Sequence, residues 1–244
     1  FGRGLVSTPN DFGFQGEVPT HPELLDYLAT RLIENDWKLK PIHREIMQSA
    51  AYRQSSAPSA EKAKIDPENR WLWRFQPRRL EAEVVRDSLL AVSGKLDPTM
   101  FGKGTLSEGH TRRSIYFMIK RSKLIPMMQI FDQPEPLVSQ GSRPRTTIAP
   151  QALLFMNNPQ VVSWAQALAA EINPGSANLD GAIRESFARV LNREPNPLEL
   201  KENRAFLEAQ MASYGEGDTN ASRRQALADF CQVLFSLNEF VYLP

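Results

Sequence analysis

The chain has 244 residues, of which 41% are hydrophobic and 23% are charged, values that are ordinary for a globular protein. Its 29 basic and 28 acidic residues give a net charge of +1, which argues against a nucleic-acid-binding domain driven by phosphate neutralisation. No apolar run is long enough to cross a bilayer. Cys231 is the only cysteine, so an internal disulfide is excluded and the redox compartment is not revealed.

The N-terminal part predicts a loop followed by two helices. Residues 1–19 carry four glycines and read as an irregular loop. Thr20 and Glu23 have the spacing of a capping box, and the helix behind them is expected to bury Leu24, Leu25, Leu28, Leu32 and Ile33. A second helix is expected near Pro41, with Ile42, Ile46 and Ala50 on one face, before a surface loop at 55–63. Because the first residue is Phe, we expect the chain to be a piece of a longer protein.

The stretch RWLWRFQPRRLEAEVVRD, residues 70–87, is the most informative part of the chain. Pro77 suits the first position of a helix, and Gly94 suits a helix end, so a central helix is predicted at 77–93. At 100° per residue, Glu81 falls inside the apolar arc, whereas Arg79, Glu83 and Arg86 form a polar stripe opposite. A buried carboxylate needs a partner, so Glu81 is expected to point inward and to meet one or more arginines.

This carboxylate defines the candidate site. The sequence offers one polar cluster, whose members are Asp11, Arg78, Arg79, Glu81, Arg112 and Arg113. The alternative is that Glu81 is a first-turn carboxylate, favoured by the helix dipole and solvated. A glycosidase-like pairing of Asp11 with Glu81, Glu83 or Asp87 is a further hypothesis.

A second candidate is the basic bracket that surrounds the segment SIYFMIK at 114–120. Its members, which could hold a sulfated or carboxylated glycan, are Arg112, Arg113, Lys120, Arg121 and Lys123. A solvated or salt-bridged flank is the alternative. Trp71 and Trp73 could form a sugar-stacking platform, although paired Trp before a helix more often anchor a core or an interface.

The rest of the chain predicts helices and ordered loops. The segment 114–120 could be a short strand or a helix, because periodicity cannot decide. A short helix is expected around 124–131, a Pro/Ser loop at 132–145, and helices at 149–157 and from 159. The last 70 residues predict a three-helix array, with a capping box at Asn196 and Glu199 and an apolar stripe that includes Cys231. The fold class is therefore mainly α, an irregular multi-helix domain with at most a minor strand near 114–120.

Motifs for common chemistry are not found in the sequence. His21, His43 and His110 stand far apart, so no metal site is predicted. The sequence has no Cys-x-x-Cys-His for haem attachment, no Gly-x-Ser-x-Gly elbow and no phosphate-binding glycine loop. No cofactor is therefore expected in this segment.

An ordered set of motifs spans essentially the whole chain and resembles a known family. The motifs are FGRGLVSTPNDFG, THPELLDYLA, YRQSS, DPENRWLWR, PRRLEAEVVRD, RRSIYFMIKR, FDQPEP, TTIAPQALLFMNNP and LNEFVYL. In this order they are similar to the planctomycete PSD-one domain, the domain of unknown function fifteen-fifty-three. The family has no established catalytic residues to carry over.

The resemblance implies a setting. Such domains lie at the C-terminus of exported multidomain proteins, after another domain of unknown function and often with a cytochrome-c-like haem module elsewhere. We therefore expect 1–244 to be a single domain, with subregions 1–145 and 146–244, that docks to the preceding domain or binds polysaccharide outside the cytoplasm. The alternative is that the chain forms part of a glycan hydrolase or of a haem-linked oxidoreductase, with the active site at the interface to the preceding domain. The isolated segment is not expected to be an enzyme.

Overall fold

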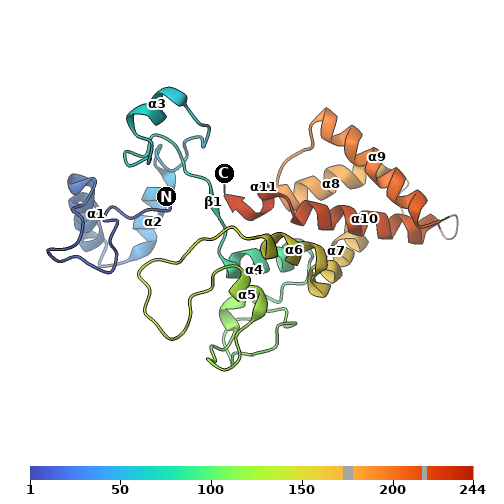
Figure 1. The fold of residues 1–244 in the computed structure, drawn as a ribbon, viewed down its shortest axis with the longest axis horizontal. Coiled ribbons are helices and arrows are strands. Elements are labelled where there is room, and N and C mark those ends of the chain that lie inside the picture. Colours follow the sequence, from blue (N-terminus) through green and yellow to red (C-terminus); the bar gives the residue numbers. More distant parts are fainter. Residues whose placement is uncertain (173–177, 216–218, 244) are drawn as a thin grey trace. The chain divides into compact units, whose positions relative to one another are not determined.

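The structure is a computed structural model that describes residues 1–172, 178–215 and 219–243. It is mainly α-helical, as predicted, and the described strands form a single two-stranded sheet, β1 (Arg78–Arg79) with β2 (Tyr242–Leu243) (Figure 1). The chain forms two compact units. Unit 1 comprises residues 1–78 with 139–142 and Leu243, and unit 2 comprises 79–138 and 143–242. The units therefore divide after residue 78, whereas the sequence suggested subregions that meet at 145.

Unit 1 contains three helices and long loops. The helices are α1 (Pro22–Glu34), α2 (Leu39–Gln48) and α3 (Ala60–Ile65), the last of which begins inside the segment expected to be a loop. The predicted capping box of α1 is wrong. His21 is the N-cap without a side-chain cap, because the Thr20 hydroxyl instead donates to the Leu5 carbonyl at 3.3 Å and lies 2.8 Å from His21 Nδ1.

Unit 1 buries few apolar side chains. The predicted burial of the α1 leucines is wrong, since no residue of α1 is buried. Among the hydrophobic residues of 1–78, those that are buried are Ile42 and Phe75. Phe75 packs edge to face with Tyr52, at 5.5 Å between ring centroids, and Tyr52 packs in the same way on Phe1. Ile42, by contrast, is buried on α2 as the apolar stripe predicted.

Unit 2 begins with α4 (Ala82–Val92), which is shorter than the predicted helix at 77–93. The start was wrong because residues 78–80 are extended: Arg78–Arg79 is strand β1, and the Leu80 N–H donates to the Val241 carbonyl at 2.8 Å. The predicted end is confirmed, since Gly94 has a φ of +68° and follows the C-cap Ser93. Only glycine adopts this left-handed conformation without a steric penalty.

An extended loop follows α4 and is interrupted by the 3-10 turn η1 (Ser114–Tyr116). The segment that periodicity left undecided is thus neither a regular strand nor an α-helix, although Thr105 and Phe117 form an isolated bridge. The predicted short helix is present as α5 (Pro126–Ile130), with Met127 and Met128 buried.

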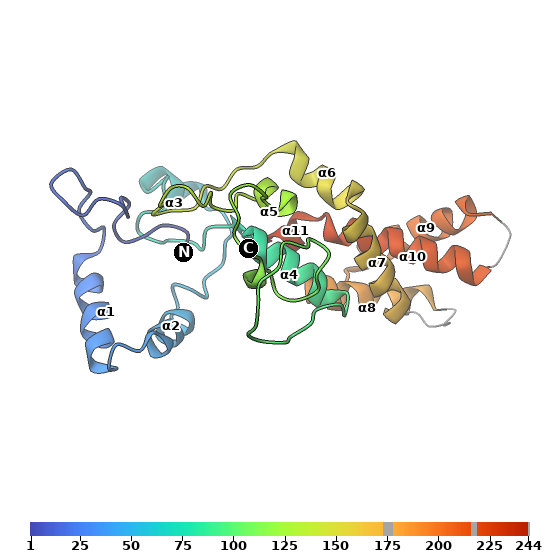
Figure 2. The ribbon, with the colours of Figure 1, turned by 90° about the horizontal axis from the view of Figure 1, so that it is seen from below.

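The remaining helices form the main core of the molecule. They are α6 (Ala149–Asn157), α7 (Pro159–Ile172), α8 (Leu179–Leu191), α9 (Pro197–Ser213), α10 (Thr219–Phe235) and α11 (Asn238–Val241). The final long helix, α10, lies at the centre and contacts α6, α7, α8, α9 and α11 (Figures 1 and 2). The predicted array of α8, α9 and α10 is present, and α7 packs on it as a fourth long helix.

The capping box of α9 is confirmed. Asn196 Oδ1 accepts from the N–H groups of Leu198 and Glu199, each at 2.9 Å, and Glu199 Oε2 accepts from the Asn196 N–H at 2.7 Å. Arg193 donates to both carboxylate oxygens of Glu199 and also pairs with Glu239. Hydrogen bonds from Arg193 and from the Asn196 backbone lower the pKa of Glu199 to about 2, from an ordinary value of 4.5.

This pKa predicts an acid-dependent loss of stability. Because the folded-state pKa lies below the unfolded one, Glu199 stabilises the fold above about pH 4.5, and the contribution disappears as the pH falls towards about 2. We expect it to be about 1 kcal/mol, since the pair is partly open to water. Urea unfolding at several pH values checks this for Glu199→Gln, with Glu202→Gln on the same helix controlling for loss of a charge. Equal pH dependence in the wild type and in Glu199→Gln would show that the interaction stores no stability.

Cys231 is fully buried on α10, as its apolar stripe predicted. Burial raises the pKa of its thiol to about 12, so the thiolate is scarce at neutral pH. We expect its reaction with a disulfide reagent to be at least about a hundredfold slower in the folded chain than in urea. A rate that is unchanged on unfolding would mean that this part of α10 opens freely.

Candidate functional site

Glu81 is the residue around which the sequence placed a site, and its predicted inward orientation is wrong. It is the N-cap of α4 with an extended backbone, and its side chain is 50% exposed. The helical projection failed because Glu81 precedes the helix. Its partner is Arg143, whose Nη1 lies 3.3 Å from Glu81 Oε2, and not one of the arginines that the sequence offered.

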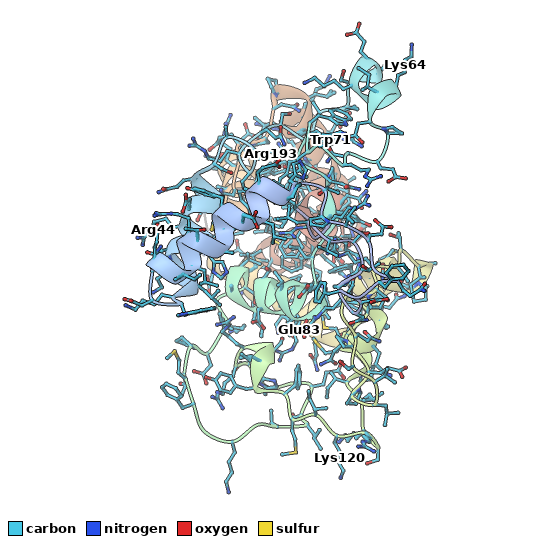
Figure 3. All side chains as sticks on the ribbon, turned by 90° about the vertical axis from the view of Figure 1, so that its left-hand side faces the viewer. Arg44, Lys64, Trp71, Glu83, Lys120 and Arg193 are labelled. Carbon is cyan, nitrogen blue, oxygen red and sulfur yellow. The ribbon has the colours of Figure 1, made fainter. Side chains whose placement is uncertain are left out.

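Glu83 makes the stronger contact with Arg143. The guanidinium donates to both carboxylate oxygens, at 2.7 and 3.1 Å, and so ties the loop 132–145 to the first turn of α4. Burial alone would raise the pKa of Glu83, but the hydrogen bonds from Arg143 hold it below the usual 4.5. A bidentate pair of this kind is a strong structural clamp. Figure 3 labels Glu83 on α4.

Arg79, expected on the polar stripe, is buried. Its Nη2 lies 2.5 Å from Asp132 Oδ2, and its Nη1 donates to the Leu80 carbonyl at 2.9 Å. Asp132 is further satisfied by the Thr146 N–H and hydroxyl, each at 2.8 Å. The pair therefore fixes both ends of the loop 132–145, which is a structural use of the charges.

Arg86 is the least expected of the charged residues, because it was predicted on the polar stripe and is 0% exposed. Its guanidinium donates to the carbonyls of Glu108, at 3.3 Å, of His110, and of Arg112, at 3.1 Å. It also lies over the Phe117 ring, 4.8 Å from the centroid. Burial lowers its pKa to about 10, so it remains charged at neutral pH. Arg86 thus holds the loop that follows α4 by its main-chain carbonyls.

Beside Arg86, Asp87 caps the turn η1. The Ser114 N–H and hydroxyl each donate to Asp87 Oδ1 at 2.7 Å, and Arg113 Nε lies 3.3 Å from Asp87 Oδ2. Arg112 turns the other way and donates to the carbonyls of Thr99 and Lys103, at 3.2 and 3.3 Å, and to that of Phe101. Both arginines of this dipeptide are therefore engaged in holding the loop.

The predicted cluster thus separates into independent contacts. Asp11 belongs to unit 1, where its Oδ1 accepts from the Gly13 N–H at 2.9 Å within its own loop, and Arg78 lies half-buried in β1. Within the described part of unit 2, Arg79, Glu81, Arg112 and Arg113 each have a different partner. Among residues 1–172, 178–215 and 219–243, no group of three His, Cys, Asp or Glu side chains could hold a metal ion.

His110, which the sequence offered only as an isolated histidine, lies beside Arg86. Its two ring nitrogens are buried and have no hydrogen-bond partner within the described residues, and its ring packs edge to face on Phe117 at 4.5 Å. Burial, followed by the charges of Arg86 and Arg112, lowers its pKa below 6.5, so the imidazole is neutral at neutral pH. The His110 ring and the Arg86 guanidinium thus both pack on the Phe117 ring.

A mostly apolar cavity of about 400 Å³ lies in unit 1. Its apolar walls come from the first loop, from α1 and α2 and from the loop before β1, and include Leu5, Leu24, Tyr27, Leu28, Ile46 and Leu72. Arg3, Glu45 and Arg70 add charged groups to its lining. Its size and composition are those of small-ligand pockets and of sockets for a partner's apolar side chains. The sequence carries one signal of it, the leucines of α1, but an apolar stripe of this kind predicts a closed core.

The geometry defines a mainly α-helical protein with one well-packed unit and one open, apolar unit. No helix in the described ranges is both long enough and apolar enough to span a membrane. Residues 1–207 match the model of the family PSD1, described as a protein of unknown function (DUF1553), and the chain belongs to this family. No curated protein and no solved structure matches the chain.

Proposed function

We propose that this chain is a helical docking module at the C-terminus of an exported, cytochrome-c-associated multidomain protein, and that it docks to the preceding domain of the same polypeptide. The exported and cytochrome-associated setting rests on the resemblance of the ordered motifs. The docking role is carried by one observation, the incomplete core of unit 1.

The core of unit 1 is incomplete because most of its large apolar side chains are exposed. Unit 1 buries two hydrophobic side chains, whereas many remain exposed, namely Phe12, Phe14, Val18, Leu24, Leu25, Tyr27, Ile33, Trp37, Leu39, Met47, Ile65 and Trp71. A unit of this size needs a much larger buried core to be stable by itself. Exposed apolar surface on this scale is typical of protein interaction sites. A partner that covers α1 and fills the cavity would supply the missing burial.

Calorimetry with the preceding domain, expressed separately, tests this proposal. Leu24 lines the cavity and is already partly exposed, so Leu24→Glu is tolerated by the free chain but puts an unpaired charge into the proposed interface. We expect binding to weaken by about thirtyfold, the equivalent of about 2 kcal/mol. The matched control is Leu198→Glu, at an exposed leucine of α9 in unit 2.

Two results would contradict the proposal. One is a wild-type chain that does not bind the preceding domain at all. The other is an equal loss of affinity in Leu24→Glu and Leu198→Glu, which would mean that unit 1 has no special part in the contact.

Polysaccharide is a second proposed partner, and one observation favours it. Trp71 is 67% exposed, and its indole packs edge to face on His21 at 5.3 Å, which braces a free aromatic face next to the cavity residues His21 and Arg70. Exposed, braced indoles are suited to stacking on sugar rings. We expect Trp71→Ala, but not the exposed-Trp control Trp37→Ala, to abolish retention on a polysaccharide column. Unchanged retention of Trp71→Ala would rule out this role.

A further inference from the structure

A strongly basic stretch of the chain lies in unit 2, at residues 98–131, and is here called the basic loop. It holds six Lys and Arg residues and a single acid, Glu108, although the whole chain is nearly neutral. From residue 109 to residue 131 there is no Asp or Glu. Figure 3 shows Lys120 at the outer end of this loop.

Two of the six cations have partners in the protein, and four do not. Arg112 donates hydrogen bonds to three carbonyls of the loop. Arg113 forms an ion pair with Asp87 of α4. The other four are exposed and form no ion pair with any described residue: Lys103, Lys120, Arg121 and Lys123. These unpaired charges point to an anionic partner.

Large apolar side chains are exposed among the free cations. Ile115 is 72% exposed and Ile119 is 70% exposed, and Met100, Phe101 and Met118 are also exposed. One small hollow is lined by Met118, Ile119, Lys120 and Lys123, so apolar and cationic groups are direct neighbours. The Phe101 N–H donates to the Tyr116 hydroxyl at 2.6 Å, which fixes the Met100–Phe101 turn beside η1.

The loop is also held in shape before it meets any partner. Arg86 on α4 donates to main-chain carbonyls of the loop at Glu108 and Arg112. Arg112 donates to the carbonyls of Thr99 and Lys103 within the loop. Binding would therefore not have to order the loop, which reduces its entropic cost.

We propose that the basic loop binds the surface of an anionic phospholipid bilayer. Aliphatic and methionine side chains offer a glycan no hydrogen bonds, whereas they insert readily at the boundary between headgroups and acyl chains. The neighbouring lysines and arginine would then lie at the level of the lipid phosphates. This inference is independent of the docking role, because it rests on a different unit of the chain.

Vesicle co-sedimentation of the full chain tests the proposal. We expect binding to mixed phosphatidylglycerol–phosphatidylcholine vesicles, and little to pure phosphatidylcholine vesicles. Lys120→Gln/Arg121→Gln/Lys123→Gln should weaken binding by about a hundredfold, given the known contribution of each basic residue near an anionic surface. The matched control, Lys62→Gln/Lys64→Gln/Lys201→Gln, removes three exposed lysines elsewhere and should bind as the wild type does.

A second pair of variants separates lipid insertion from simple charge attraction. Ile115→Ser/Ile119→Ser keeps every charge and should weaken vesicle binding at least about tenfold. The control Ile65→Ser/Leu198→Ser should have no effect. The proposal is overturned if the wild type ignores anionic vesicles, if both lysine variants lose binding equally, or if the isoleucine variant binds normally. Equal wild-type affinity for a soluble sulfated glycan and for the vesicles would also overturn it.

Discussion

Replacing Arg86 by Ala is expected to lower the free energy of unfolding of unit 2 by about 3–5 kcal/mol. The side chain is fully buried, and its removal would leave the carbonyls of Glu108, His110 and Arg112 without their donor. Partly buried carbonyls that lose a charged donor keep a desolvation cost that the donor had offset. The measurement is urea unfolding followed by circular dichroism.

Two further variants make this prediction specific. Arg86→Met keeps the volume but not the donors, and should be nearly as destabilising as Arg86→Ala. Arg184→Ala removes a half-exposed arginine that pairs with Glu194 at 3.0 Å, and should cost less than about 1 kcal/mol. If Arg86→Met were as stable as the wild type, the carbonyl contacts would not be what Arg86 contributes.

Phe230→Ala is expected to destabilise unit 2 by about 3–5 kcal/mol as well. Phe230 is 0% exposed on α10, and its ring centroid lies 6.3 Å from that of Phe187 on α8 and 6.4 Å from that of Phe206 on α9. Its loss would open a cavity where three helices meet. Val233→Ala, at an exposed position of the same helix, is the control, and should change the unfolding free energy by less than about 0.5 kcal/mol. A similar effect of both variants would contradict the packing described for α8, α9 and α10.

The parts of the fold that the sequence predicted well depend on local patterns. The box of Asn196 and Glu199 specifies the start of α9 through bonds within four residues, and Gly94 specifies the end of α4 through its own φ. The apolar stripe of α10, with Leu227, Phe230 and Cys231, matches a core that surrounds that helix. The mainly α fold class could be predicted because helix starts, helix ends and apolar stripes are all local signals.

The parts that it predicted wrongly depend on contacts distant in the chain. The start of α4 moved from Pro77 to Ala82 because Leu80 bonds to Val241, which no local pattern reveals. Arg86 is buried because carbonyls more than twenty residues away cover it. Glu81 likewise pairs with Arg143, a residue distant in the sequence that no local pattern reveals. The helical projection of 77–93 therefore assigned these charges to the wrong environments.

The open surface of unit 1 shows a different limit of sequence reasoning. The amphipathic pattern of α1 correctly predicted a helix, and an apolar stripe normally implies a core beneath it. Here the stripe is present, but α1 has no buried residue. Periodicity identifies an apolar face, and it does not identify whether the same chain or another one covers that face. In the docking proposal, a separate domain covers the apolar face of α1.

Hydrogen exchange tests that proposal most directly. The comparison is between this chain alone and a longer polypeptide that also carries the proposed preceding domain. We predict that α1 and the cavity segments near Leu5 and Leu72 exchange rapidly in the chain alone and become strongly protected in the longer polypeptide. The amides of α7 and α10 should be equally protected in both. Unit 1 amides that exchange at the same rate in both proteins would contradict the account.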